Sequence, residues 1–307
     1  MLVLELHARG IHFEEVRNTR LPAYAQMHNH DAAVPYIVIS PFSEWGLSET
    51  LRLLRQYRIY NNIAVSVRAG GHGYFNGASC EGVMINLSNM TSACIKDDVL
   101  ILDPGGILGQ TIHYLNKAEK VVPHGDCYEV AAGGHFTTAG WDVILSRKYG
   151  LGCQTLLGGR VVLWDGTVLE VNESSYPDLM WAMRGGAAAE VGVVSRLDLQ
   201  LVDAPKYATW RESVLDLRQL RVCIENNIVA KAVGLPRELS IYFKVVFVQK
   251  KEEPVCHVSL FSLLPVSENI SILREHLGNG IMDAFSDVEG GAPDQLLTSE
   301  CCRPPPF

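Results

Sequence analysis

The sequence predicts an α+β protein built from two domains. An apolar run over 33–43, a segment of helical spacing over 43–59 and a second apolar run over 63–72 indicate a strand–helix–strand unit. From about residue 206 the sequence pattern changes to further strand segments, with alternating apolar and polar residues over 239–244. Pro205 lies between these regions and marks the expected boundary. We expect an N-terminal arm over 1–32, a first domain over 33–205 and a second domain over 206–307.

Each further element follows from its local pattern. Ser43 is a suitable cap for the helical segment, and Asp165 with Gly166 forms the expected turn of a hairpin over 160–171. The strand–helix–strand unit favours parallel strands with a ligand at their carboxyl ends. The other expected elements are strands at 82–88 and 99–106, a helix at 107–120, a helical second half of 135–150, a short helix from residue 177, a strand ending at Pro205, strands at 238–249 and 256–265, and a helix at 267–278.

The charge balance excludes several classes of partner. The 307 residues include 34 acidic and 26 basic side chains, a formal net charge of −8, and no basic patch interleaved with aromatic residues. Such a surface is unsuited to nucleic acid or anionic lipid. The apolar run at the N-terminus is too short for a signal peptide or a membrane span. We expect a cytoplasmic protein with a small-molecule substrate, and predict no oligomeric state.

A glycine-rich loop, "SVRAGGHGYFNGAS" over 66–79, follows the second predicted strand. Consecutive backbone N–H groups in such a loop can bind an anion, because glycine has no Cβ to hold a phosphate away. A dinucleotide is therefore a natural ligand, although an isolated Gly-Gly-His after a strand is more often a tight turn. No G-x-G-x-x-G follows a strand and opens a helix, which excludes a Rossmann site.

A second loop, "PHGDCYEVAAGGHFTTAGW" over 123–141, carries Cys127 and another Gly-Gly-His. Its small residues indicate that backbone follows a flat or phosphorylated ligand. Taken singly, a cysteine is more often a core residue than a nucleophile, and a histidine is more often structural. The run "HNHD" at 28–31 has no convergent ligands elsewhere, so we expect a polar loop and no metal site.

Seven ordered motifs resemble a known family. They are "VRAGGHGYFNGAS", "INLSNM", "LDPGGILGQ", "GDCYEVAAGGHF", "SRKYGL", "VVLWDGTVLEV" and "PDLMWAMRGG". Together they resemble the FAD-linked oxidases of the berberine bridge enzyme and glucooligosaccharide oxidase type, within the vanillyl-alcohol-oxidase class. The resemblance runs from about residue 33 to 205 and implies a PCMH-type FAD-binding domain of two α/β subdomains, followed by a substrate domain with an antiparallel sheet.

The resemblance implies covalent attachment of FAD. His72 matches the histidine that bonds through a ring nitrogen to the flavin 8α-methyl carbon, and Cys127 matches the cysteine that adds to flavin C6 in doubly linked members. Imidazole and thiolate are nucleophiles, and the oxidised isoalloxazine ring is electron-poor. Such covalent links tend to raise the reduction potential of the flavin.

The resemblance also implies a set of cofactor-binding residues. Arg68 to Tyr74 would surround the pyrophosphate, and His135 would donate a hydrogen bond to the flavin. Val130 matches the position facing flavin C4a, where valine favours reaction with oxygen and leucine a dehydrogenase. The full set is Arg68, Ala69, Gly70, Gly71, Gly73, Tyr74, Leu87, Ser88, Met90, Val130, Gly133, Gly134, His135, Gly140, Tyr149, Gly150 and Leu151.

The sequence departs from the family pattern at several places. "CYEVA" replaces "CPTVG", "GCQT" at 152–155 replaces "AADN", and "RGGAAAEVGVV" replaces a more glycine-rich loop. Enzymes of this type also continue for well over a hundred further residues, with a segment that folds back onto the flavin. We therefore expect the second domain to be incomplete here, which leaves the catalytic base undefined. Tyr242, on the polar face of the strand at 238–249, is a candidate for this base. The alternative, an ordinary half-buried tyrosine on a strand, is the commoner case for such a position.

These motifs favour an FAD-dependent oxidase of secondary metabolites or sugars. A base would remove a proton from an alcohol or amine-bearing carbon while hydride passes to flavin N5, and O2 would reoxidise the flavin to give H2O2. A dehydrogenase is the close variant. The alternative is a flavin-binding protein that uses FAD structurally, as a cyclase-like scaffold or a truncated inactive product.

Overall fold

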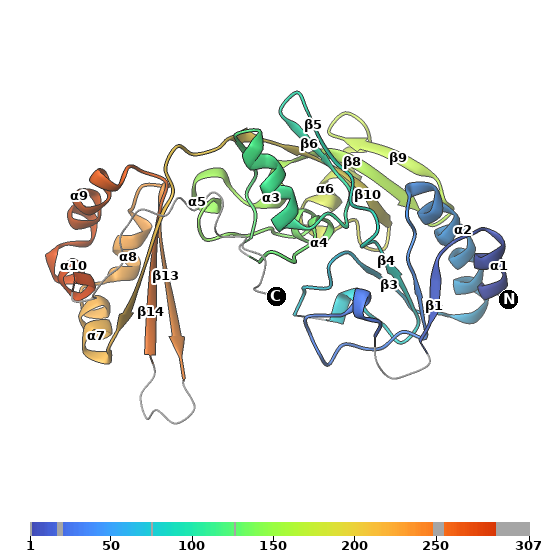
Figure 1. Cartoon of the computed structure of the whole chain (residues 1–307), viewed down its shortest axis with the longest axis horizontal. Coiled ribbons are helices and arrows are strands. Elements are labelled where there is room, and N and C mark those ends of the chain that lie inside the picture. The colour runs from blue at the N-terminus through green and yellow to red at the C-terminus, as the bar shows by residue number, and fades with distance from the viewer. Residues whose placement is uncertain (1, 17–20, 75, 126, 248–254, 287–307) are drawn as a thin grey trace. The chain divides into compact units, whose positions relative to one another are not determined.

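The chain folds into two compact units. The computed structural model describes residues 2–16, 21–74, 76–125, 127–247 and 255–286 (Figure 1). Unit 1 comprises the segments 1–141 and 151–202, and unit 2 the segments 142–150 and 203–301. Helices and mostly antiparallel sheets occur in both units, which confirms the predicted α+β class.

The first sheet of unit 1 contains the predicted strand–helix–strand unit. Its order is β1 (Phe13–Glu15), β2 (Ile37–Ile39), β4 (Val83–Asn86) and β3 (Val65–Arg68), and both β2 and β3 run parallel to β4. The parallel strands are thus confirmed, with β4 between the two that were expected to pair. Arg68 and Asn86 are register partners, so the glycine loop after β3 and the residues after β4 leave the sheet at one edge.

Helix α2 (Glu44–Asn61) connects β2 to β3. Its predicted cap is confirmed, because the Ser43 hydroxyl oxygen accepts a hydrogen bond from the Gly46 N–H at 3.2 Å. Leu47, Leu51 and Leu54 of α2 are buried against the first sheet. Residues expected as an N-terminal arm supply α1 (Leu2–Ala8) and β1, and Leu6 and Ile11 join the same core.

The second sheet of unit 1 is antiparallel. Its order is β5 (Ala93–Lys96), β6 (Val99–Leu102), β10 (Gly192–Gln200), β8 (Leu156–Leu163) and β9 (Val168–Asn172). Helices α3 (Leu108–Lys117), α4 (Ala132–Thr137) and α6 (Pro177–Gly186) share its core through Ile112, Phe136 and Met180. The hairpin of β8 and β9 is confirmed, and Asp165 stabilises its turn by accepting from the Thr167 N–H at 2.9 Å.

Two sequence expectations are wrong in detail. The second Gly-Gly-His was expected in a loop but lies inside α4. Close packing requires glycine at its first position, since a Cβ on Gly133 would lie 2.9 Å from the Cβ of Pro104. The strand expected to end at Pro205 ends at Gln200 and is followed by the short β11 (Val202–Asp203). Between the two glycine segments, β7 (Lys120–Val121) follows α3.

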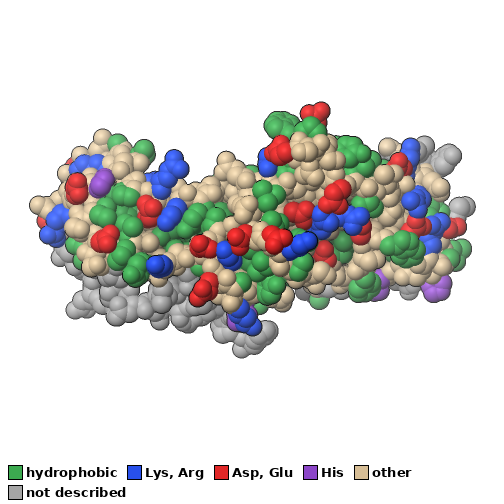
Figure 2. Space-filling model, turned by 90° about the horizontal axis from the view of Figure 1, so that it is seen from above, with side chains coloured by type: hydrophobic (Ala, Val, Ile, Leu, Met, Phe, Trp, Pro, Cys, Tyr) green, Lys and Arg blue, Asp and Glu red, His purple; other side chains and the backbone are tan. Residues whose placement is uncertain are grey.

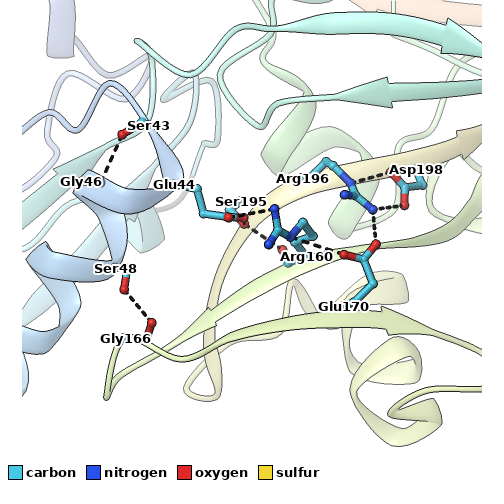
Figure 3. Close-up of polar contacts among 10 residues, drawn as sticks. All are labelled: Ser43, Glu44, Gly46, Ser48, Arg160, Gly166, Glu170, Ser195, Arg196 and Asp198. Carbon is cyan, nitrogen blue, oxygen red and sulfur yellow. Dashed lines mark hydrogen bonds and ion pairs between the residues drawn. The ribbon is translucent and has the colours of Figure 1, made fainter.

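Polar contacts join α2 to the second sheet (Figure 3). The Glu44 carboxylate pairs with Arg160 of β8 at 2.9 Å and accepts from the buried Ser195 hydroxyl of β10 at 2.8 Å. The Ser48 hydroxyl donates to the Gly166 carbonyl oxygen at 2.6 Å. These bonds hold the two sheets of unit 1 together beside the cavity described below.

Unit 2 is a three-stranded antiparallel sheet covered on one face. Its order is β12 (Thr209–Leu215), β14 (Val255–Ser262) and β13 (Leu239–Val246). The remaining elements of unit 2 are α5 (Ser146–Tyr149), α7 (Leu217–Glu225), α8 (Ile228–Val233), α9 (Val266–Leu277) and α10 (Asn279–Ser286). Leu239 of β13 and Val258 of β14 pack against Cys223, Leu277 and other residues of α7–α10, which lie on one side of the sheet (Figure 1).

The surface shows a mixed charge pattern. On the face drawn in Figure 2, acidic and basic side chains of the described residues are interspersed. In the part of the chain that the structure describes, no helix combines the length and apolarity needed to cross a membrane.

Candidate cofactor site

A cavity of about 570 Å³ lies within unit 1, where the first sheet meets α4 and the second sheet. Its volume falls within the range of about 300–1,000 Å³ typical of small-molecule sites. Residues 69–73 of the first glycine segment and residues 133–135 of the second both line it. Trp141 and Val193 contribute further lining. The two Gly-Gly-His motifs, 63 residues apart at their first glycines in the printed sequence, therefore form walls of one site.

The cavity gathers most of the predicted cofactor residues. Those that line it are Ala69, Gly70, Gly71, His72, Gly73, Leu87, Val130, Gly133, Gly134, His135 and Gly140. Those outside its lining in unit 1 are Arg68, Tyr74, Ser88, Met90, Cys127 and Leu151. Tyr149 and Gly150 belong to unit 2. The role of each residue toward FAD stays a prediction.

The two glycine segments approach so closely that side chains are excluded. A Cβ on Gly70 would lie 2.8 Å from the backbone nitrogen of Ala131, and a Cβ on Gly133 would lie 3.0 Å from the Cβ of Ala69. Real Cβ atoms are not found at such separations from backbone, so only glycine permits this contact at Gly70. The two glycine segments therefore meet with their backbones in close contact at this part of the cavity wall.

Arg68, the last residue of β3, holds the first glycine segment from behind. Its guanidinium donates to the carbonyl oxygens of Ala69 at 3.1 Å and Gly70 at 3.0 Å, and twice to that of Gln26 at 3.2 and 2.7 Å. The remaining donor reaches Asn86 Oδ1 at 2.9 Å. Since the guanidinium has five N–H groups, these contacts use its whole donor capacity. Arg68 therefore shapes the loop through its backbone carbonyls, and its place around a pyrophosphate stays a prediction.

The Arg68 charge is buried without a counter-ion. The residue is 6% exposed, and within the described ranges no carboxylate pairs with it. Burial lowers the pKa of Arg68 to about 10, so the guanidinium remains charged at neutral pH. A positive charge therefore lies directly behind the cavity wall, where it favours an anionic ligand.

Two backbone N–H groups of the same loop, those of Gly70 and Gly71, can donate hydrogen bonds to such a ligand. The carbonyl of Arg68 accepts from Leu87, those of Ala69 and Gly70 from the guanidinium, and that of Gly71 from the His28 N–H at 2.8 Å. In a trans peptide the N–H points opposite to the C=O, so the N–H groups of Gly70 and Gly71 point away from Arg68. Among the described residues neither has an acceptor. Gly71 adopts φ +68°, which suits such an anion-binding turn.

His72 lies in the cavity wall with its ring against that of His28. The rings of His28 and His72 are stacked, with centroids 4.7 Å apart and planes inclined by 15°. Tyr74 contacts the His28 ring edge-on at 5.1 Å, and its side chain is largely exposed. Sequence reasoning missed His28, because the "HNHD" run was interpreted only as a polar loop.

His135 is held as a neutral imidazole. The pKa of His135 is lowered to about 4, chiefly because burial penalises the imidazolium, although a hydrogen bond with the backbone of Pro123 opposes the shift. Its Nε2 atom is buried and has no hydrogen-bond partner in the described part of the chain. The predicted hydrogen bond to the flavin remains a prediction, and any such bond requires Nε2 to become accessible.

The Cys127 segment is anchored to the first turn of α3. The Leu108 N–H donates to the Val130 carbonyl at 2.8 Å, and the Gly109 N–H donates to that of Tyr128 at 3.1 Å. The Tyr128 ring occupies the space where a Cβ of Gly109 would lie. This contact accounts physically for the tyrosine that stands where the family pattern has proline. Val130 lines the cavity, and the Cys127 side chain is exposed.

Tyr242 lies on the face of β13 opposite the helices of unit 2. Its neighbours along the strand, Ile241 and Phe243, pack into the core, whereas Tyr242 is 42% exposed. The predicted alternation is therefore confirmed, and the role as a base stays a prediction. On the same face, His257 Nδ1 lies 2.9 Å from Glu212 Oε1. The searched residues of the chain hold no group of three metal-ligating side chains.

The observed groups fit an anionic dinucleotide. A buried cation behind the wall, N–H groups directed away from it and a glycine-rich backbone suit a diphosphate. His72, on the same loop, supplies a nucleophile next to that position. FAD carries both a diphosphate and an electrophilic ring, so the residues present are compatible with this cofactor.

Comparison with known proteins gives a consistent result. Residues 35–172 match the FAD binding domain family. A chitooligosaccharide oxidase from Gibberella zeae is 34% identical over 155 residues, 49% of this chain and 31% of that protein. A glucooligosaccharide oxidase from Sarocladium strictum is 28% identical over 197 residues, 60% of this chain and 38% of that protein. The matched part of this chain thus covers well under half the length of these two relatives.

Solved structures share the fold. A chitooligosaccharide oxidase superposes with a TM-score of 0.78 at 22% identity, covering 94% of this chain and 59% of the other. A glucooligosaccharide oxidase from Acremonium strictum, described as carrying 6-S-cysteinyl, 8α-N1-histidyl FAD, gives 0.76 at 20% identity, covering 93% and 58%. The predicted fold class is confirmed by these superpositions.

Proposed function

We propose that this chain, whose residues 35–172 match the FAD binding domain family, is the flavin-holding part of an FAD-dependent oxidase. The observation that carries the proposal is the cavity itself. Both Gly-Gly-His segments line it, the N–H groups of Gly70 and Gly71 have no acceptor among the residues that the structure describes, and the buried charge of Arg68 lies behind them. The diphosphate of FAD would bind at this loop.

His72 is the proposed covalent attachment site, with Cys127 as a second one. His72 lies in the cavity wall, on the same loop as the proposed diphosphate position, and this position supports the proposal. The Cys127 thiol is exposed and precedes Val130, a wall residue, by three positions. The doubly linked FAD described for the glucooligosaccharide oxidase structure supports this assignment.

The proposed substrate is a small molecule with an alcohol or amine-bearing carbon, and a saccharide is the first class to test. Relatives named for chitooligosaccharides and glucooligosaccharides support this choice. Bound FAD would accept hydride from that carbon, and O2 would reoxidise it to give H2O2. Tyr242, exposed on the open face of β13, is the proposed base to test first.

The test is the state of the flavin in the purified chain. We expect yellow protein whose colour stays with the acid precipitate, and FAD mass on the peptides containing His72 and Cys127. Addition of a suitable oligosaccharide should bleach the flavin, and air should restore the colour. A flavin that never bleaches with alcohol, amine or saccharide substrates would favour a structural use of FAD. Protein that takes up no FAD would refute the proposal.

A further inference from the structure

The segment from Gln26 to Asn29 braces the loop that carries His72. The Gln26 carbonyl accepts two bonds from Arg68, and the His28 N–H donates to the Gly71 carbonyl at 2.8 Å. Asn29 Nδ2 donates to the Tyr74 carbonyl at 2.9 Å. The segment therefore contacts the loop on both sides of His72, although more than forty residues separate them in the sequence.

Within this brace, His28 contacts the loop at two points. Its backbone N–H holds the residue before His72, and its ring stacks on the His72 ring at 4.7 Å with an inclination of 15°. The ring of Tyr74, two residues after His72, also contacts the His28 ring, with centroids 5.1 Å apart and planes inclined by 87°. Two fixed points restrict both the backbone position and the ring plane of His72.

We propose that His28 is a positioning residue for covalent flavin attachment, which presents the His72 imidazole in the orientation that the bond requires. The proposal rests on the proposed function, because it concerns the same flavin link. Bond formation needs the nitrogen lone pair directed at the flavin 8α carbon, and a freely rotating ring meets that condition only part of the time. Stacking on His28 keeps the ring plane fixed before FAD arrives.

The attachment step balances with dioxygen as the oxidant. One C–H bond of the 8α-methyl group and the imidazole N–H bond break, and a C–N bond between the 8α carbon and the His72 ring forms. The two electrons and two protons released leave on O2 as H2O2. His28 neither gains nor loses atoms in this step, which is why its role is one of position.

The test compares His28→Ala and His28→Phe, with His30→Ala as the matched control. His30 is an exposed histidine two residues further along the same segment. Each chain is produced without flavin and given FAD in air. The rate at which FAD mass appears on the His72 peptide is measured, together with the affinity for FAD before attachment. Phenylalanine keeps the stacked ring but has no titrating nitrogen, so it separates orientation from acid–base effects.

We expect His28→Ala to slow attachment at His72 at least about tenfold, with FAD affinity changed by less than about threefold. His28→Phe should recover most of the rate, and His30→Ala should match the wild-type chain. Attachment in His28→Ala at the wild-type rate would overturn the proposal and leave the proposed function intact. Equal slowing in His28→Ala and His28→Phe would also overturn it. A wild-type chain that binds FAD without a His72 link would overturn both this proposal and the proposed attachment site.

Discussion

The Arg68 guanidinium donates through both Nε and Nη2 to the carbonyl oxygen of Gln26, at 3.2 and 2.7 Å. Further donors of the same group hold the carbonyls of Ala69 and Gly70. One buried side chain thus joins the N-terminal segment, the end of β3 and the glycine loop. The anion-binding geometry of the loop depends on this arrangement.

Replacement of Arg68 by methionine should disrupt the loop. Three backbone carbonyls would lose their donors, and each buried unsatisfied group costs about 1–3 kcal/mol. We expect the free energy of unfolding to fall by at least about 3 kcal/mol, and FAD binding to be lost. Arg68→Lys retains the charge without the planar fork, so it should recover part of the affinity only. Denaturant titration and FAD titration provide the measurements; unchanged FAD affinity in Arg68→Met would contradict this role.

Gly70 and Gly134 provide a matched pair for the cavity wall. A Cβ on Gly70 would meet the backbone of Ala131 at 2.8 Å, whereas a Cβ on Gly134 would meet no atom of the described residues within 4 Å. Gly70→Ala should therefore destabilise the chain by about 1–3 kcal/mol. Gly134→Ala lies inside α4 and should be neutral or stabilising by up to about 1 kcal/mol. Thermal unfolding of the two variants tests this order, and equal melting temperatures would refute it.

The sequence predicted the site better than it predicted the contacts that build it. Strand β3 ends at Arg68 and is followed by the glycine segment. The ordered motifs predicted Gly70, His72 and Gly133 as site residues, and the fold brings all three to one cavity. The Arg68 contacts were not predictable, because their acceptors are backbone carbonyls, which every residue carries. The α4 helix was taken for a loop because glycine is a poor helix former, and here its packing against Pro104 overrides that preference.

His28 shows a different limit of sequence reasoning. Its partner His72 lies 44 residues away, and the strand–helix–strand unit between them hides the contact. A stacked pair of histidines has no spacing rule, unlike a metal site. The "HNHD" run was therefore visible in the sequence, while its position against the glycine loop required the fold.

The buried His135 should make the chain acid-sensitive. Its pKa of about 4 in the folded state lies below the ordinary value of 6.5, so the unfolded chain binds the proton more readily. The stabilisation from this group is complete above pH 6.5 and is lost as the pH falls toward 4. The loss amounts to about 3 kcal/mol at most. We expect the unfolding free energy of the wild-type chain to fall more steeply over this window than that of His135→Gln. Parallel pH dependences would contradict the assignment.

The contact between Glu44 and Ser195 should couple α2 to β10. The Ser195 hydroxyl is 2% exposed and donates to Glu44 at 2.8 Å, beside the Arg160 ion pair (Figure 3). A double-mutant cycle of Glu44→Ala and Ser195→Ala should give a coupling energy of about 0.5–2 kcal/mol in denaturant unfolding. A cycle of Glu44→Ala with the exposed Glu173→Ala should give none. Additive effects at Glu44 and Ser195 would show that the bond contributes nothing to stability.

Val130 should control the access of oxygen to the bound flavin. It lines the cavity and is half-buried, and its carbonyl is fixed by the Leu108 N–H. Val130→Leu adds one methylene group to a wall whose backbone cannot retreat, so it should narrow the path for O2. We expect air reoxidation of the reduced flavin to slow by about tenfold or more, while reduction of an artificial dye stays within about twofold. Val67→Leu is the control, because Val67 is also a half-buried valine of the cavity wall on β3. Equal slowing in both variants would indicate a general loss of space, and unchanged reoxidation in Val130→Leu would exclude this residue from oxygen access.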